Sequence, residues 1–548
     1  MRALTAAAWI GVLWVALSGA VVQAAEYFVA PDGDDAAAGS MSKPFASVER
    51  AQQAAAAGDT VWIRGGQYRF SGTTRTVGVA FTKSGTPDKP IRYFAYQDEV
   101  PIFDLFELKP QERVTGLDVH CNAIHLRGLE VRGVRQQIVG DSWSVRVRGD
   151  HNVIERLNVH DGQAPGIFIA SGAGNLILNC DSHHNYDPLE DGGNGDGFGC
   201  HSPGGDNVLR GCRAWSNSDD GFDFINAPGT CTVERSWSFR NGYVPDTTTA
   251  SGNGAGFKSG GFGSPPNIPS SGVPRHVVRF NLAFRNRSQG FYANHHPGGL
   301  TFVNNTAFAN AINFDMLVEG GTSTHVLHNN IAMMPGGSVM RFTGGEDSSN
   351  SWNLPVMVMA DDFAGMDEME ALSPRQADGS LPEIRFMHLA EGSDLIDRGM
   401  KLDQPFAGAA PDLGAFERGL GAGSEAMMDA GVPAMPGSLD AGGAGAAAPD
   451  AGVAVGMAGA GRGGAGGEPR VLGESGGGGA VAGGVGLADR GGSGTAGIGG
   501  APSAGVAAAD GCSCRLVAGQ RRTAVALWLL LVAALVVRAR ARARARAR

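Results

Sequence analysis

The sequence predicts an all-β protein whose main body, residues 26–418, is a parallel β-helix, a solenoid of stacked coils. Three observations predict this fold: a composition with 85 Gly among 548 residues, and two short motifs that recur in step along the body. A glycine-rich chain favours turns and strands over long helices. Motifs that return at intervals of one coil are the signature of a repeat architecture.

The N-terminal elements come first. Residues 1–25 have one early Arg, an apolar run and small residues at the end, which is the layout of a secretory signal peptide. Ser47 can cap a short helix over 48–57, and Gly58 ends it before a strand over 60–64. We expect this N-terminal helical cap to cover the first coil, whose edge would otherwise be exposed.

Two units then recur through the body. The first ends in Asn, at positions separated by 32, 24, 45 and 24 residues: Asn185, Asn217, Asn241, Asn286 and Asn310. The second is Gly-Phe followed by one further residue, at 197–199, 221–223, 256–258 and 290–292. Both fit a coil of about 24 residues with longer loops in some turns. Aligned Asn side chains can form a hydrogen-bonded ladder and tolerate a left-handed turn backbone.

Stacking of the second unit gathers acidic residues. Equivalent positions of successive coils lie about 4.8 Å apart, so the register places Asp196 against Asp220 and, with Asp219 nearby, Asp223 beside Lys258. Like charges this close repel by a few kcal/mol, and we expect the cluster to hold a cation. Ligands that are all carboxylate oxygens favour calcium over zinc. A solvated Asp-Asp-Gly turn is the alternative.

The lysine beside this cluster completes a possible reaction site. A nearby cation disfavours the ammonium form, so Lys258 could act as a neutral base. Calcium on a uronate carboxylate would acidify the adjacent carbon, and proton abstraction followed by loss of the 4-linked sugar would be a β-elimination. An ion pair with Asp223 is the alternative role for the lysine.

These motifs resemble a known family. Asp-Gly-Phe at 196–198, Ser-Asp-Asp-Gly-Phe-Asp at 218–223 and Gly-Phe-Lys at 256–258 are similar to the family-nine polysaccharide lyases, right-handed parallel β-helices that include pectate lyases. The resemblance covers most of the body. It implies calcium binding and proton abstraction by the matching residues: Asp196, Asp219, Asp220 and Asp223 as ligands, and Lys258 as the base.

Departures from the family pattern concern the substrate. Gly199-Cys200-His201 stands where pectate lyases of the family often have Ala-Ala-Lys, and the 294–299 loop resembles a branch that includes rhamnogalacturonan lyases. The expected substrate is a pectate, cleaved to 4,5-unsaturated oligogalacturonates, with rhamnogalacturonan as the alternative. His201, Tyr292 and His295 are candidate substrate contacts. A glycan-binding adhesin without activity and a hydrolase with paired carboxylates stay open.

The C-terminal part has a different character. Residues 419–510 are rich in Gly, Ala and Ser, with too little large apolar surface to fold, and are predicted to be a disordered linker. Residues 511–548 combine a Gly-Cys-Ser-Cys motif, an apolar segment over 523–537 and an Arg-rich end. They resemble a myxobacterial-type C-terminal sorting signal, which implies attachment at the outer membrane and display on the cell surface. A plain transmembrane anchor is the alternative, although the run is short for a span.

The net charge and the cysteine count limit the classes of binding partner and the disulfide pairings that are expected. The net charge of -10 argues against a nucleic-acid partner. It does not argue against an acidic plant-type polysaccharide, because a bound cation inverts the local sign. Five cysteines lie in the body: Cys121, Cys180, Cys200, Cys212 and Cys231. In an exported protein they can pair, but the odd number leaves at least one outside such a pair. We expect a secreted monomer.

Overall fold

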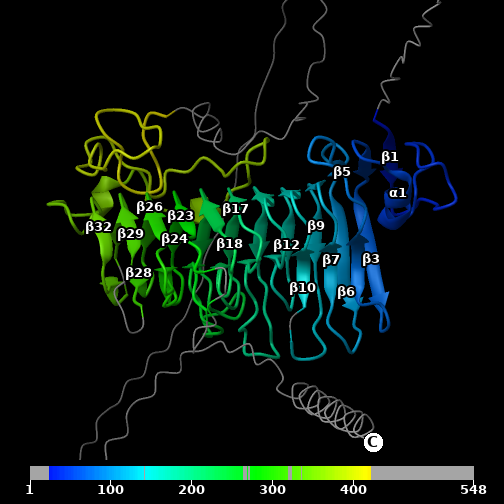
Figure 1. Cartoon of the computed structure of the whole chain (residues 1–548), viewed down its shortest axis with the longest axis horizontal. Coiled ribbons are helices and arrows are strands. Elements are labelled where there is room, and N and C mark those ends of the chain that lie inside the picture. The colour runs from blue at the N-terminus through cyan, green and yellow to red at the C-terminus, as the bar shows by residue number, and fades with distance from the viewer. Residues whose placement is uncertain are drawn as a thin grey trace, which may run out of the picture. The chain divides into compact units, whose positions relative to one another are not determined.

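The computed structural model describes residues 24–140, 142–262, 268, 272–318, 324–334 and 336–420. Its strands form three sheets of 12, 10 and 10 strands, and from β5 onwards the sheet neighbours of each strand stand three places away in the chain (Figure 1). Neighbouring strands run parallel, as in the pairs that β16, β19 and β22 form. A chain that visits three parallel sheets in turn is a parallel β-helix, so the predicted fold class is confirmed.

The 12-stranded sheet runs the length of the solenoid. It consists of β1 (Glu26–Val29), β2 (Thr60–Ile63), β5 (Ile91–Ala95), β8 (Ile124–Arg127), β11 (Val153–Glu155), β14 (Leu176–Leu178), β17 (Asn207–Arg210), β20 (Cys231–Glu234), β23 (Val277–Arg279), β26 (Thr301–Val303), β29 (His325–His328) and β32 (Gly345–Ser348).

The second sheet carries the candidate active site and is called the site sheet. It consists of β4 (Val77–Phe81), β7 (Thr115–Val119), β10 (Trp143–Val147), β13 (Ile167–Ile169), β16 (Phe198–Cys200), β19 (Phe222–Asp223), β22 (Phe257–Lys258), β25 (Gln289–Tyr292), β28 (Ile312–Met316) and β31 (Ser338–Phe342).

The third sheet is called the covered sheet, because a later segment of the chain packs on part of its outer face. It consists of β3 (Gly66–Gly72), β6 (Pro101–Leu108), β9 (Glu130–Arg132), β12 (Asn158–His160), β15 (Asp181–His183), β18 (Arg213–Trp215), β21 (Trp237–Phe239), β24 (Leu282–Phe284), β27 (Thr306–Phe308) and β30 (Ile331–Met333).

The N-terminal helix α1 covers the first coils, as predicted, but it is shorter. It spans Val48–Ala54, and the Ser47 hydroxyl accepts a hydrogen bond from the backbone N–H of Arg50 at 3.1 Å. The prediction of a helix to residue 57 was wrong because the N–H of Ala56 donates to the Asp59 carboxylate at 2.8 Å. That carboxylate replaces the helical carbonyl acceptor and turns the chain toward β2.

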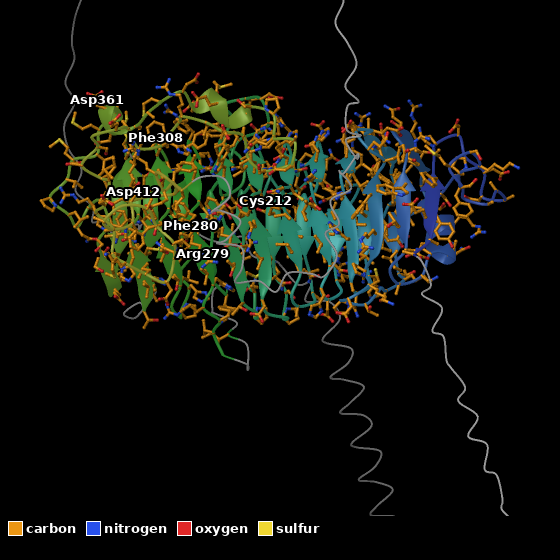
Figure 2. All side chains as sticks on the ribbon, turned by 90° about the horizontal axis from the view of Figure 1, so that it is seen from above. Cys212, Arg279, Phe280, Phe308, Asp361 and Asp412 are labelled. Atoms are coloured by element: carbon orange, nitrogen blue, oxygen red, sulfur yellow. A yellow bond between two sulfur atoms is a disulfide. The ribbon has the colours of Figure 1, made fainter. Side chains whose placement is uncertain are left out.

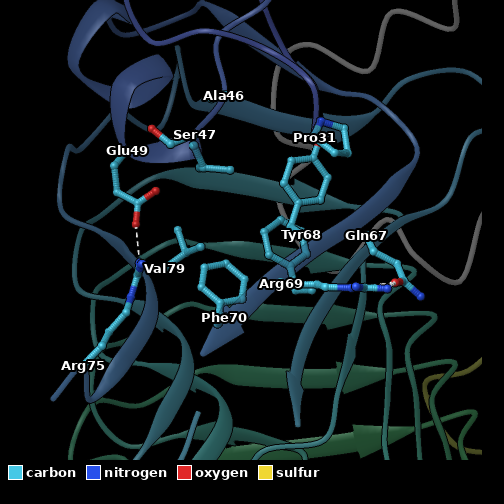
Figure 3. A pocket seen from close by; sticks show the side chains of 12 residues that line it. Pro31, Ala46, Ser47, Glu49, Gln67, Tyr68, Arg69, Phe70, Arg75 and Val79 are labelled. Atoms are coloured by element: carbon cyan, nitrogen blue, oxygen red, sulfur yellow. Dashed lines mark hydrogen bonds and ion pairs between the residues drawn. The ribbon is translucent and has the colours of Figure 1, made fainter. Parts of the chain in front are cut away.

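A hollow of about 220 Å³ lies beside this cap (Figure 3). Tyr68 and Phe70 of β3 form one part of its lining, and Arg75 pairs with Glu49 of α1 at 2.7 Å on another. None of its lining residues belongs to the candidate active site.

A stack of phenylalanines in the core fixes the register of the site sheet. Phe198, Phe222, Phe257, Phe291 and Phe314 are buried and lie opposite one another on successive strands. Their ring centroids are 4.8, 4.7, 5.0 and 4.9 Å apart. Because side chains alternate along a strand, the residue after each Phe faces outward.

The predicted asparagine ladder is also present. The Nδ2 groups of Asn185, Asn217, Asn241 and Asn286 donate to the Oδ1 atom of the next ladder residue, the last being Asn310, at 3.0, 3.1, 2.9 and 3.0 Å. These side chains are buried, so the ladder satisfies amides that would otherwise destabilise the core.

One detail of this ladder was predicted wrongly. The left-handed backbone belongs to the residue before each ladder Asn, as at Ser216 (φ 52°), Arg240 (φ 56°) and Arg285 (φ 56°). The ladder Asn can then turn its amide inward toward the next coil. A second ladder, which the sequence interpretation missed, joins Asn281, Asn305, Asn330 and Asn350.

The coils end at Ser348, so the whole of 26–418 is not a solenoid. Residues 349–418, called the covering segment, contain two short 3₁₀ helices, η1 (Ala360–Asp362) and η2 (Glu368–Leu372), and pack on the covered sheet. Phe239, Phe284 and Phe308 of the sheet form one apolar cluster with Phe363 and Phe386 of the segment. Figure 2 labels Phe308 on the sheet and Asp361 and Asp412 in the segment.

The body cysteines follow the odd-number expectation. Cys200 of β16 and Cys231 of β20 form a disulfide, while Cys121, Cys180 and Cys212 are reduced and buried. The disulfide links the site sheet to the 12-stranded sheet.

Several predictions fall on residues that the structure does not describe. Most of the signal peptide, nearly all of the linker 419–510 and the tail 511–548 lie outside the described residues. Within the described ranges, no helix has the length and apolar character that crossing a membrane requires.

Candidate active site

The predicted register of the site sheet is correct. On β16, β19, β22 and β25 the residues after the core Phe are Gly199, Asp223, Lys258 and Tyr292, and they lie opposite one another in that order. The phenylalanine stack on the inner side forces these four positions to the outer face. Asp223 and Lys258 are therefore neighbours because of the coil spacing.

Three aspartates form a compact group beside this row. One carboxylate oxygen from each of Asp196, Asp219 and Asp220 lies within 4.8 Å of the others, and all three side chains are buried. One oxygen of each is held by a backbone N–H of a following coil. Asp196 accepts from Asp220 at 3.0 Å, Asp220 accepts from Ala255 at 2.6 Å, and Asp219 accepts from Asn253. The carboxylates are thus oriented before any ligand binds.

The electrostatics of this group favour a bound cation. Burial raises the pKa of Asp196 and of Asp219 well above the usual range, and repulsion among the neighbouring aspartates adds to the effect. Burial also raises the pKa of Asp220, against the attraction of Lys258. The buried Oδ2 atom of Asp220 lies 3.2 Å from the Nζ atom of Lys258. Three converging carboxylates whose charges repel suit a hard divalent cation with oxygen ligands.

Asp223, the fourth predicted ligand, stands apart from this group. Its Oδ2 atom lies 3.2 Å from the Nζ atom of Lys258, and its Oδ1 atom accepts from the backbone N–H of Ile225 at 2.7 Å. The structure therefore brings three of the four predicted ligands together, and Asp223 lies outside that group, in contact with Lys258.

Lys258 lies at the centre of the arrangement and is 4% exposed. Its Nζ atom is 3.2 Å from Asp220 Oδ2, 3.2 Å from Asp223 Oδ2 and 3.3 Å from Asn253 Oδ1. The amine is thus held in one position by acidic and amide oxygens. A fixed amine beside a candidate cation site is suited to remove a proton from a bound substrate.

Asn253 was missed by the sequence interpretation. It lies in the loop before β22, and no repeat or periodicity reports where such a loop folds. Arg287 holds the loop by donating to the carbonyl of Asn253 at 2.8 Å and to the carbonyl of Gly252. These bonds give Arg287 a positioning role. The signal in the sequence for this tight loop was the two glycines that flank Asn253, Gly252 and Gly254, which both adopt positive φ in the structure.

Two arginines of neighbouring strands and turns also have carboxylate partners in the protein. Arg279 pairs with Glu234 through its Nε atom at 2.6 Å, and Arg285 pairs with Glu368 through its Nε atom at 2.7 Å.

The three candidate substrate contacts lie on either side of Lys258. His201 follows β16, with its Nε2 atom 4.0 Å from Asp223 Oδ2. Tyr292 lies on β25, one coil beyond Lys258, and its ring centroid is 6.0 Å from that of His295. All three side chains are partly exposed. Their contacts with a sugar stay a prediction.

Comparisons with known proteins show which family this fold belongs to. Residues 27–330 match the family model described as "Pel9A-like, right handed beta helix region". A pectate lyase L from Dickeya chrysanthemi is 35% identical over 403 residues, which are 72% of this chain and 90% of that protein.

Two solved structures are similar over most of the described body. A rhamnogalacturonan lyase has a TM-score of 0.64 and 36% identity, over 68% of this chain and 97% of that one. Pectate lyase Pel9A has a TM-score of 0.63 and 33% identity, over 73% of this chain and 98% of that one.

Proposed function

Because the chain belongs to the Pel9A-like right-handed β-helix family and is a polysaccharide lyase, we propose that it cleaves galacturonate-containing pectic polysaccharide by calcium-dependent β-elimination. The observation that carries the proposal is the contact of Lys258 with the acidic cluster, at 3.2 Å from both Asp220 and Asp223. Base and candidate cation site are thus one unit on the site sheet. The family membership argues against the adhesin and hydrolase alternatives.

The chemistry follows from what each residue can do. Asp196, Asp219 and Asp220 would hold the calcium ion, which supplies positive charge to the substrate carboxylate and so acidifies the hydrogen on the neighbouring carbon. Lys258 in its neutral form accepts that proton. The electron pair of the broken C–H bond forms the new double bond, and the C4–O bond breaks. The 4-linked sugar leaves with the electron pair of that bond on its oxygen, which takes a proton from solvent. Asp223 and Asn253 keep the lysine amine in place.

The product identifies the reaction. With calcium and polygalacturonate, the chain should release 4,5-unsaturated oligogalacturonates that absorb ultraviolet light, and a chelator should stop the release. Lys258→Ala should lower turnover by about 10²–10⁴, the usual contribution of a general base. Lys109→Ala is the matched control, because Lys109 is a surface residue paired with Glu107. Full activity in Lys258→Ala, or hydrolysed products without a double bond, would overturn the mechanism.

Rhamnogalacturonan is a second candidate substrate. The solved rhamnogalacturonan lyase is as similar to this chain as Pel9A is. The partly exposed Phe168 also gives the site sheet an apolar surface in the same outer row as Asp223. The same assay on both polymers separates the two candidates.

We further propose that the chain is exported as a monomer and held at the cell surface through residues 511–548. The signal-peptide layout and the Gly-Cys-Ser-Cys motif of the sequence support this location. Fractionation of cells that express the full chain should find it in the outer membrane. The double variant Cys512→Ser, Cys514→Ser should be released into the medium, and an unchanged distribution would contradict the role of the motif.

A further inference from the structure

The outer row of the site sheet continues beyond the acidic cluster, toward the N-terminal coils. Arg146, Phe168, Gly199 and Asp223 occupy this row on β10, β13, β16 and β19, each opposite the next. Arg146 and Phe168 are partly exposed, whereas Asp223 is buried. A polymer bound along the row at Asp223 and Lys258 would therefore also contact Phe168.

The ring of Phe168 is held in place by its neighbours. It occupies the space above Gly199 on the next strand, where an added Cβ atom would overlap the ring. His201 meets the ring edge-on, with centroids 4.6 Å apart, and Trp143 lies on another side at 6.3 Å. Since Gly199 has no side chain, the ring can lean over β16 toward the acidic cluster. This is a physical role for the glycine at a position that departs from the family pattern.

The chemistry of the row changes from strand to strand. Arg146 offers a guanidinium group, which lies 3.8 Å over the ring of Trp143. Phe168 offers an aromatic face, and the acidic cluster offers a cation site. A uronate carboxylate over a phenyl ring would lose hydration without gaining a charged partner. The C–H face of a neutral sugar, or a methyl group on it, gains from the same contact.

We propose that Phe168 is a specificity-determining residue that stacks on a neutral sugar adjacent to the uronate at the acidic cluster. The preferred polymer then alternates uronate with a neutral, deoxy-type sugar, as rhamnogalacturonan does. Gly199 makes room for the ring, and His201 positions its edge. This inference rests on the proposed function, since it assumes that the substrate lies along the site sheet.

The test compares two polymers and two phenylalanines. Phe168→Ala should shift the ratio of kcat/KM for rhamnogalacturonan over polygalacturonate about tenfold toward polygalacturonate, chiefly through KM, for a lost contact of about 1.4 kcal/mol. Phe168→Tyr should restore the ratio to within about threefold, because it keeps the ring. Gly199→Ala should shift the ratio in the same direction as Phe168→Ala, since the new methyl group displaces the ring.

Phe106→Ala is the matched control. Phe106 is partly exposed on β6 of the covered sheet, lies over a glycine of the next coil, Gly133, and has Arg135 4.6 Å above its ring. It should leave the ratio unchanged. An unchanged ratio in Phe168→Ala, or an equal shift in Phe106→Ala, overturns the proposal.

Direct binding separates this proposal from the proposed function. Calorimetry with rhamnogalacturonan oligosaccharides should show about tenfold weaker binding to Phe168→Ala than to the full wild-type chain, whether or not the polymer is cleaved. If the wild-type chain binds them in this way but releases no unsaturated product, the lyase function fails and the stacking role stands. If the wild-type chain and Phe168→Ala bind them equally, or neither binds, the stacking role is wrong.

Discussion

The site sheet and the covered sheet are built on the same strand spacing but use their outer faces in opposite ways. An aspartate of each region shows the difference, Asp220 being buried and Asp181 partly buried. On the site sheet, Asp220 lies among other carboxylates, and its pKa is raised. On the covered sheet, Asp181 lies between Arg213 and Arg375, at 2.8 and 2.7 Å, and its pKa is lowered.

The two environments have different consequences. The two arginines compensate the charge of Asp181, and the covering segment packs over this part of the sheet. Asp181 therefore contributes to stability. Around Asp220, negative charges are concentrated without enough counter-charge, which costs stability unless a cation binds. The comparison shows that the same regular fold can use one outer face to bind a ligand. It uses another to bind its own C-terminal segment.

Neutralising Asp220 tests whether its carboxylate serves cation binding or stability. Asp220→Asn should lower lyase turnover about a thousandfold, because the cation site loses a ligand and several kcal/mol of charge stabilisation. Without calcium, its free energy of unfolding should stay within about 1 kcal/mol of wild type or rise, since repulsion among the carboxylates is relieved. Turnover and urea unfolding are the two measurements. A large loss of stability would make Asp220 a structural residue.

The reciprocal change is Asp181→Asn. It should lower the free energy of unfolding by about 3 kcal/mol, because two arginines on the covered sheet lose their shared carboxylate. Turnover of the molecules that remain folded should stay close to wild type, since Asp181 is on a different sheet from Lys258. Denaturant unfolding and active-enzyme concentration check this outcome. Loss of turnover in fully folded protein would contradict the separation of the two faces.

Calcium should stabilise one face alone. At a calcium concentration of 100 times Kd, the free energy of unfolding should rise by about 2.7 kcal/mol. The rise should persist in Asp181→Asn and vanish in Asp220→Asn, as thermal unfolding with and without a chelator would report. Magnesium should give a smaller rise, because it prefers a tighter octahedral shell that retains water. An equal rise in both variants would place the cation elsewhere.

Acid should weaken the covered side. His388 of the covering segment stacks on Phe416 at 3.8 Å, and burial lowers its pKa to about 4. The folded-state pKa is below the unfolded value of about 6.5, so its contribution is complete above pH 6.5 and is lost as the pH falls toward 4. Allowing for partial exposure, we expect a loss of about 2 kcal/mol. His388→Gln should remove that part of the pH dependence, and an unchanged slope would exclude His388 as its source.

Much of the site sheet could be predicted from the sequence. The Gly-Phe unit fixes which residue points inward, and the coil register then fixes the neighbours of Asp223 and Lys258. The anchoring of each Asp by a backbone N–H could not be predicted, because it depends on loop conformations such as that of Asn253. The covering segment has no repeat, so its place on the covered sheet was missed. The outer aromatic residues Phe239, Phe284 and Phe308 were the one signal, since large apolar side chains facing outward require a cover.

Because the phenylalanine stack repeats from coil to coil, the number of coils can change without a change in the candidate active site. Each coil contacts only the coils beside it, and Asp196, Asp220 and Lys258 come from three consecutive coils. Duplication of a coil on the N-terminal side of β10 would therefore lengthen the surface for a polymer without moving any of these groups. Evolution can thus adjust how many sugar units such a protein holds separately from how it breaks the bond between two of them.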